Sequence, residues 1–314
     1  MLARLKPGKD INRTATLGRK VFSTFDRKIE IYFLIPAFVF TILLLAIPII
    51  MSFYYSFTNK SLLGKPLKMV GLNNYIRILT DQSFFIAMKN TIVFTAFSLA
   101  GQLLLGLIIA LALNRIKRLK GFFRTLILVP WAFPMIAVSL TWTYLLNDFY
   151  GIINAWLIKW GWVSEPVLFL SNPKLALITL ILINIWFGAP LFAINILASL
   201  QVIPKDIYEA AHIDGAGVFN VFFHITLPYI KVVIGLLMVL RTIWIFNNFD
   251  MVYLLTGGGP GTVTTTVPIY AYREGWTLHS LGRSSAVTII LLVFLLIVAS
   301  IYFKILDKWE KEVY

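Results

Sequence analysis

Long apolar stretches alternate with short polar segments along the chain. Asp, Glu, Lys and Arg are absent from residues 31–53, 90–113, 125–146, 175–204 and 284–303. Each stretch reaches the roughly 20 residues that a helix needs to cross about 30 Å of hydrocarbon. Lipid offers no hydrogen-bond partner to a peptide group, so such stretches must be helical. The pattern predicts an all-α membrane protein.

A sixth apolar stretch, residues 232–255, carries Arg241 and Asp250. A charge at membrane depth is costly and normally faces a cavity or a protein partner rather than lipid. We count this stretch as a transmembrane helix, which predicts six spans, and we take its charged residues as a pointer to function.

The composition agrees with a membrane protein. Hydrophobic residues make up 59% of the 314 residues and charged residues 13%, whereas soluble domains carry about 25% charged residues. Cysteine is absent, which excludes disulfides, thiolate metal sites and cysteine nucleophiles.

The net charge of +14 is unevenly placed, with Lys and Arg concentrated in residues 1–30 and 114–124. The positive-inside rule makes both regions cytoplasmic, and an even number of spans then puts both termini there. The expected organisation is a basic cytoplasmic segment (1–29), a six-helix domain (30–304) and a cytoplasmic tail (305–314). The basic segment is either a helix lying on anionic lipid or a disordered tail.

The segment between the fourth and fifth spans, residues 204–228, predicts a compact projection. Pro204 followed by acidic residues is typical of a helix start, and Gly215 and Gly217 predict a bend before a second helix that Pro228 closes. Such a projection can fit a groove on another protein, or it can rest on lipid headgroups.

This segment resembles the signature loop of the membrane subunits of bacterial ABC importers: Glu-Ala-Ala, three residues, Gly, nine residues, Ile-x-Leu-Pro. The matching residues are Glu209, Ala210, Ala211, Gly215, Ile225, Leu227 and Pro228. The resemblance implies that the loop forms coupling helices that insert into ATPase subunits. The residues expected to make this contact are Glu209, Ala210, Ala211, Asp214 and Gly215.

Further segments are similar to the sugar-importer branch, of the maltose, lactose and glycerol-phosphate type: residues 71–75, 90–91, Pro130 with Pro134, 255–260 and 264–266. This resemblance implies a type I ABC importer fold in the bacterial cytoplasmic membrane, moving a sugar, with an oligosaccharide or a sugar derivative favoured. It also implies a second homologous permease subunit, two ATPase subunits that hold ATP and Mg²⁺, and an external sugar-binding protein. The chain itself is then a non-catalytic subunit without a cofactor or metal.

The glycine run 257–261 could suggest a phosphate-binding loop. Such a loop needs a lysine after its last glycine, and none follows here. We therefore interpret the run as a turn and expect ATP to bind a separate subunit.

The polar residues of the fifth span are candidates for a sugar site. At helical spacing one stripe holds Arg241, Trp244, Ile245 and Asn248, and Asn247 and Asp250 form another. The alternative is that they only hold helices together. Alignment with the maltose system adds four residues of the fourth span, and the expected substrate pathway is Asn184, Phe187, Gly188, Leu191, Arg241, Ile245, Asn247, Asn248 and Asp250. Arg241 would bind an acidic or phosphorylated sugar, or pair with a neighbouring subunit.

Two other classes of membrane protein compete with this reading. An ion-coupled secondary transporter would use broken helices and usually internal repeats, and would not need a docking loop. An intramembrane enzyme would need paired catalytic groups, which the sequence does not offer. The histidines His212, His224 and His279 lack ligand spacing.

Overall fold

The computed structural model describes residues 32–116 and 118–311, apart from the side chain of residue 310. The chain divides into two units, residues 1–54 and 55–314. The described part of the first unit belongs to an apolar helix, Tyr32–Ser56, which contains the π-helical turn η1 (Ile42–Ala46) and continues as α2 (Ile47–Ser56). The predicted basic segment 1–29 lies outside the described residues.

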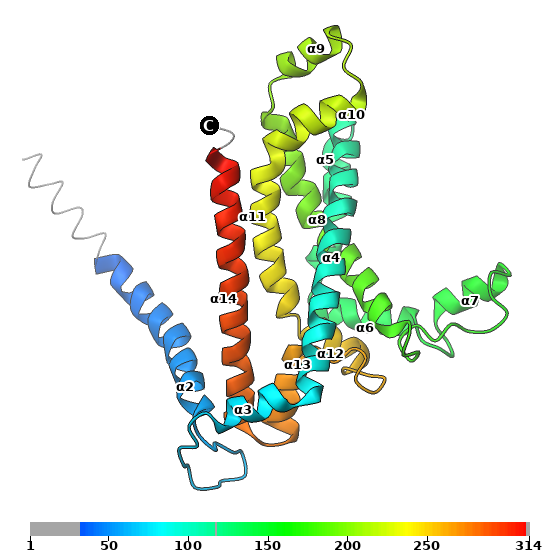
Figure 1. The fold of residues 1–314 in the computed structure, drawn as a ribbon. Helices are drawn as coiled ribbons and strands as arrows, with labels where there is room; N and C mark the ends of the chain where they lie inside the picture. Colours follow the sequence, from blue (N-terminus) through cyan, green and yellow to red (C-terminus); the bar gives the residue numbers. More distant parts are fainter. Residues whose placement is uncertain (1–31, 117, 312–314) are drawn as a thin grey trace, which may run out of the picture. The chain divides into compact units, whose positions relative to one another are not determined.

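The second unit is helical throughout its described regular elements, apart from one isolated β-bridge between Thr58 and Met69. Figure 1 shows the order of its elements. They are α3 (Asn73–Thr80), α4 (Gln82–Arg115), α5 (Lys120–Leu128), η2 (Val129–Ala132), α6 (Met135–Leu145), α7 (Ile152–Lys159), α8 (Ala176–Val202), α9 (Lys205–Ile213), α10 (Val218–Val221), η3 (Phe222–Thr226), α11 (Leu227–Phe246), α12 (Asp250–Thr256), α13 (Val267–Tyr272), η4 (Arg273–Thr277) and α14 (Leu281–Lys311).

In the described residues, five helices are long and apolar enough to cross a membrane, and a bent pair makes a sixth span if counted as one. The bent pair is 120–132 with 135–145, and its two halves meet at 89°. Pro130 lies in η2 and Pro134 precedes α6. Proline lacks an N–H and clashes with the preceding turn, which explains the predicted bend at this position.

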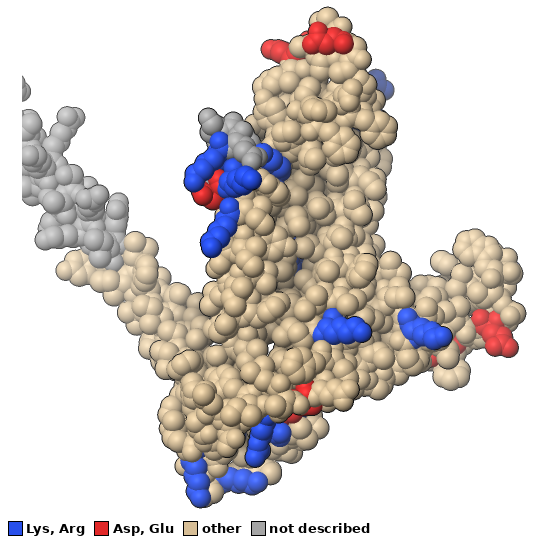
Figure 2. Space-filling model, in the orientation of Figure 1, with Lys and Arg blue, Asp and Glu red and all other residues tan. Residues whose placement is uncertain are grey.

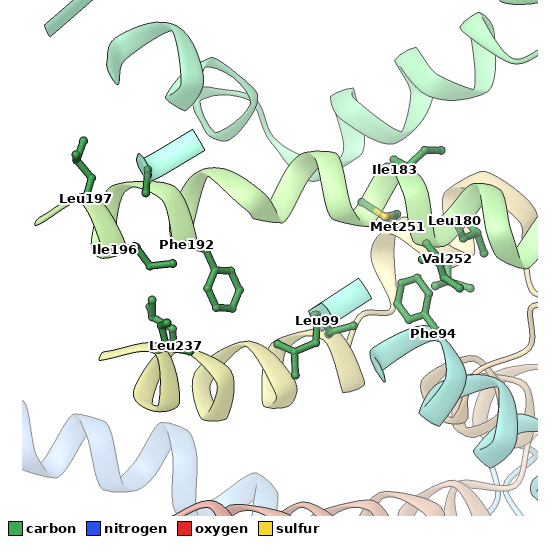
Figure 3. Packing of buried hydrophobic residues seen from close by; sticks show 14 of the residues in the cluster. Phe94, Leu99, Leu180, Ile183, Phe192, Ile196, Leu197, Leu237, Met251 and Val252 are labelled. Atoms are coloured by element: carbon green, nitrogen blue, oxygen red, sulfur yellow. The ribbon is translucent and has the colours of Figure 1, made fainter. Parts of the chain in front are cut away.

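The main core lies between α4 and α8, with α11 packed against both. Figure 3 shows its side chains, which come from α4, α8, α11 and α12. Phe192, Ile196 and Leu197 of α8 are almost fully buried. At Gly106 of α4, an added Cβ would collide with Phe192 and lie 3.0 Å from the carbonyl oxygen of Ala189. Glycine therefore permits the close approach of these two helices, as small residues do in membrane bundles.

The helix around Pro228 differs from the prediction. We expected Pro228 to close the projecting segment, but the helix runs without a break from Val218 to Phe246. Pro228 occupies the first turn of α11, directly after the π-helical turn η3. A proline is tolerated at such a position, because the preceding wide turn changes the backbone hydrogen-bond register. The expected sixth stretch, 232–255, is instead broken between α11 and α12.

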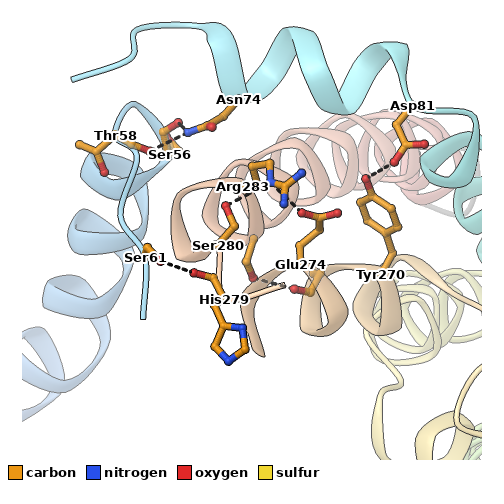
Figure 4. A network of polar contacts seen from close by, with 12 residues as sticks. Ser56, Thr58, Ser61, Asn74, Asp81, Tyr270, Glu274, His279, Ser280 and Arg283 are labelled. Atoms are coloured by element: carbon orange, nitrogen blue, oxygen red, sulfur yellow. Dashed lines mark hydrogen bonds and ion pairs between the residues drawn. The ribbon is translucent and has the colours of Figure 1, made fainter. Parts of the chain in front are cut away.

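A polar network fixes the end of the unit where α3, α13 and η4 lie (Figure 4). Asn74 donates from Nδ2 to the carbonyls of Ser56 and Thr58, each at 2.8 Å. The hydroxyl of Tyr270 donates to Asp81 at 2.6 Å. Burial acts to raise the pKa of Asp81, but this bond and those from Ser83 outweigh it and lower the pKa.

Glu274 is the buried acid of this network. Its Oε2 lies 2.9 Å from Nε of Arg283, but that N–H donates to the hydroxyl of Ser280, so the pair is an electrostatic contact without a hydrogen bond at Oε2. Burial raises the pKa of Glu274, against the opposing influence of Arg283. The folded state therefore favours the protonated acid more than the unfolded state does.

This shift predicts a pH-dependent stability difference between the wild type and Glu274→Gln. Because the folded pKa is raised, ionised Glu274 costs stability above that pKa, and the cost disappears as the pH falls below the unfolded value of about 4.3. The wild-type melting temperature minus that of the variant should rise as the pH is lowered from 8 to 5. Thermal unfolding in detergent measures it, and a difference that is flat or falls toward acid pH would contradict the assignment.

The α4–α8 contact predicts that Gly106→Ala lowers thermal stability, because the added methyl group overpacks the interface at a cost of roughly 1–3 kcal/mol. Gly121→Ala is the matched control, since an added Cβ there meets nothing within 4 Å. Size-exclusion chromatography after heating would compare the two. Equal stability of both variants would show that the glycine contact is not tight.

Candidate functional site

An open cavity of about 390 Å³ lies where α11 ends and α12 begins. Its size is within the range of small-molecule sites, about 300–1,000 Å³. The lining residues are Trp131, Met135, Asn184, Phe187, Arg241, Trp244, Ile245, Asn247, Asn248, Phe249 and Asp250. They come from the bent span, α8, α11 and the break that follows α11, so elements far apart in the sequence meet here.

Three buried polar side chains form a continuous chain behind this cavity. Arg241, which is 5% exposed, donates from Nε to Oε1 of Gln102 at 2.9 Å. Gln102 then donates from Nε2 to Oδ1 of Asn184 at 2.7 Å and to its carbonyl at 2.9 Å. Because every member has a partner, the network holds the guanidinium group of Arg241 in one orientation.

Aromatic rings form another part of the cavity wall. The ring of Trp131 stacks on Phe187 with centroids 6.2 Å apart, and its Nε1 donates to the carbonyl of Phe187 at 2.7 Å. The guanidinium carbon of Arg241 lies 5.6 Å from the centroid of Trp244, a cation–π contact. Rings, amides and a guanidinium together can bind both the faces and the hydroxyls of a polar ring-shaped ligand.

The amides at the helix break also have structural roles. Asn247 donates from Nδ2 to the carbonyl of Ile243 at 2.9 Å, at the end of α11. Asn248 accepts at Oδ1 from the backbone N–H of Met251 at 3.2 Å, in the first turn of α12. Both asparagines therefore stabilise the ends of helices, as the alternative hypothesis proposed. Nδ2 of Asn248 has no hydrogen-bond partner among the described residues.

The projecting segment lies at the end of the unit opposite α3 and α13 (Figure 1). No residue of α9 is buried, and Gly215 closes the helix in the left-handed conformation, with φ at +74°. That conformation is easy only for glycine. The N–H of Ala216 donates to the carbonyl of Ala211 at 2.9 Å, and the hydroxyls of Tyr208 and Thr226 lie 3.2 Å apart, which ties α9 to η3.

The surface of this segment combines acids with apolar side chains. Glu209 and Asp214 are exposed, and Figure 2 shows acidic side chains at the tip. Ile213 is 86% exposed and Phe219 79% exposed. Apolar groups exposed in this way mark a surface that contacts a protein or a membrane.

Comparison with known proteins identifies the family. Residues 102–311 match the model of the binding-protein-dependent transport system inner membrane component. The chain belongs to this family. It is therefore the permease component of an ABC transport system, located in the inner membrane.

Individual relatives cover nearly the whole permease. It is 34% identical to the trehalose/maltose transport system permease protein MalF of Thermococcus litoralis over 89% of this chain and 94% of that protein. It is also 34% identical to the sulfoquinovosyl glycerol transport system permease protein SmoG of Agrobacterium fabrum, over 90% and 91%. A crystal structure of a bacterial ABC transporter involved in the import of the acidic polysaccharide alginate contains a chain with the same fold, with a TM-score of 0.79 and 24% identity over 92% and 99% of the two chains. The predicted permease fold is confirmed.

The structure brings together seven of the nine residues expected along the substrate pathway. The exceptions are Gly188 and Leu191, which do not line the cavity. An added Cβ at Gly188 would collide with the amide of Gln102, so this glycine makes room for the buried network. Leu191 packs against the core. Asn247 and Asp250, expected on a separate stripe, reach the same cavity because the helix breaks between them.

Sequence reasoning did not assign Trp131, Met135, Phe249 or Gln102 to the site. The sequence does contain an indication for Gln102, because it is an amide inside the largely apolar stretch 90–113. Polar side chains in such a stretch normally face a protein interior. The indication for Trp131 is weaker: it lies between Pro130 and Pro134, where the span was expected to bend. In the described parts of the chain, no group of three or more His, Cys, Asp or Glu side chains could hold a metal ion.

The network predicts that Gln102→Leu destabilises the permease and disturbs the cavity. The substitution leaves the buried Arg241 without its protein hydrogen bond, at a cost of about 1–3 kcal/mol or more for a charged group. Gln201→Leu, at an exposed position near the end of α8, is the control. Thermal unfolding in detergent measures both variants, and equal melting temperatures would show that the bridge contributes nothing.

Proposed function

We propose that this permease moves a sugar through the cavity at the α11–α12 break, driven by ATPase subunits that bind the segment 204–228. The observation that carries the proposal is the unbroken helix from Val218 to Phe246. One end of it belongs to the exposed projecting segment, and the other end delivers Arg241 and Trp244 to the cavity. A displacement of the segment therefore displaces one wall of the cavity.

The cavity chemistry supports a saccharide. Aromatic faces pack against the C–H patches of a sugar ring, and amides and guanidinium groups donate to its hydroxyls. Relatives are named for trehalose/maltose, sulfoquinovosyl glycerol, diacetylchitobiose and sn-glycerol-3-phosphate transport. The substrates in these names are sugars or polyol derivatives. The expected cargo of this permease is an oligosaccharide or a sugar derivative.

The partners follow from the same scheme. A second homologous permease subunit would complete the pathway, two ATPase subunits would bind and hydrolyse ATP with Mg²⁺, and an external binding protein would deliver the sugar. The relevant solved relative is a bacterial alginate ABC transporter in complex with an alginate pentasaccharide-bound periplasmic protein. The segment 204–228, the end of α4 and the C-terminal end of α14 lie at one end of the unit (Figure 1), which we assign to the cytoplasm together with both termini. The chain itself would supply no catalytic group.

The ATPase contact is proposed to involve Glu209, Ala210, Ala211, Asp214 and Gly215. All but Ala211 are exposed, and Ala211 is half-buried. Acids beside exposed apolar groups suit a groove that has an apolar floor and basic residues at its edge. An ion-coupled transporter would have no use for such a segment, and the family to which the chain belongs argues against that alternative.

Gly215→Asp should abolish association with the ATPase subunits while leaving membrane insertion intact, because aspartate at φ +74° strains the turn that presents α9. Gly161→Asp is a matched control, since Gly161 has φ +69° and open space around it but lies in a different loop. Co-purification of the assembled transporter with its ATPase subunits measures the effect. Normal association of Gly215→Asp would overturn the docking role.

Glu209→Lys tests the same surface without backbone strain. Reversing an exposed acid that faces a complementary groove should weaken the complex at least tenfold, or about 1.4 kcal/mol. Glu165→Lys reverses another exposed glutamate outside the segment and should have no effect. ATPase activity coupled to transport in proteoliposomes is the second readout, and unchanged coupling in Glu209→Lys would contradict the proposal.

A further inference from the structure

The guanidinium group of Arg241 has one protein hydrogen bond and no ion-pair partner among the described residues. Its Nε donates to Gln102 at 2.9 Å, and one face lies against Trp244. Arginine presents five N–H donors in a planar fork. The bond at Nε fixes the plane of that fork and leaves the Nη donors of a cavity-lining residue unused.

This arrangement places a permanent positive charge, 5% exposed, at the wall of a cavity. A buried charge without a counter-charge is expensive. The amide oxygen of Gln102 and the Trp244 ring offset only part of that cost. The site therefore attracts an anionic group, and it holds that group best through the paired, charge-assisted hydrogen bonds that guanidinium makes with carboxylates and other oxyanions.

The other ionisable residue of the lining is Asp250. It lies at the start of α12 and is exposed, and no ion pair joins it to Arg241. Its carboxylate accepts hydrogen bonds and suits sugar hydroxyls. The free Nδ2 of Asn248 donates to them. The cavity thus offers a cation for one end of a ligand and hydroxyl-binding groups for the rest.

We propose that the cavity selects saccharides that carry an oxyanion, and that Arg241 is the residue that confers this preference. The proposal rests on the sugar-permease function inferred above and adds the charge of the cargo. The oxyanion, a carboxylate, sulfonate or phosphate, binds at the Nη donors. The sugar ring lies against the aromatic wall formed by Trp131 and Phe187.

The test compares matched acidic and neutral ligands on the assembled transporter without its binding protein, so that only the membrane cavity selects. The probes are galacturonic acid disaccharide against its methyl ester, 6-deoxy-6-sulfoglucose against glucose, and maltose 6′-phosphate against maltose. Titration followed by tryptophan fluorescence gives the dissociation constants. In the wild type at least one acid should bind about tenfold more tightly than its neutral counterpart, equivalent to about 1.4 kcal/mol.

Arg241→Gln should bring that ratio close to one, while Arg77→Gln, at an exposed arginine of α3, should leave it unchanged. If Arg241→Gln fails to assemble, the wild-type ratios alone decide. Equal or tighter binding of all three neutral ligands overturns the proposal and leaves Arg241 to pair with another subunit. A preference that survives in Arg241→Gln also overturns it. If no acidic or neutral sugar binds the wild type or stimulates its ATPase, the sugar-permease function itself fails.

Discussion

Every break in a membrane-embedded helix exposes backbone groups that lipid cannot satisfy, and the cavity of this permease is built where two such breaks meet. In the bent span, α5 and η2 give way to α6, and the indole of Trp131 binds the carbonyl of Phe187. Between α11 and α12, Asn247 and Asn248 take over backbone bonds. The two asparagines that bond the backbone at the second break also line the cavity.

The polar interior depends on a tight apolar frame. The contact of α4 with α8, permitted by Gly106 and Gly188, brings Gln102 within reach of Asn184. Arg241 on the neighbouring α11 completes the chain of bonds. The polar contacts therefore depend on this packing: a wider spacing of α4 and α8 would separate Gln102 from Asn184, and the amide that orients Arg241 would lose its own support.

Much of this architecture could be predicted from the sequence. The absence of charge over five stretches located the spans, the prolines located the bend, and Gly215 located the end of α9. The break at Asn247 was not predicted, because apolar residues continue on both sides of it, in α11 and in Met251–Leu255 of α12. Gly188 and Leu191 were placed in the pathway by alignment with a related system. Such an alignment does not show which face of α8 packs against α4. Gly188 makes room for Gln102 of α4, and Leu191 packs against the core. Gln102 was missed because its significance depends on Arg241, 139 residues later in the chain.

The π-helical turn η3 affects the orientation of the whole helix Val218–Phe246. A wide turn takes up one more residue than an α-helical one, so it sets the rotational phase of everything that follows. If the same residues closed this turn as regular α-helix, every following position would be advanced by about 100° around the helix axis. Arg241 and Trp244 would then turn away from the cavity that they line. The wide turn therefore sets which residues of α11 face the cavity.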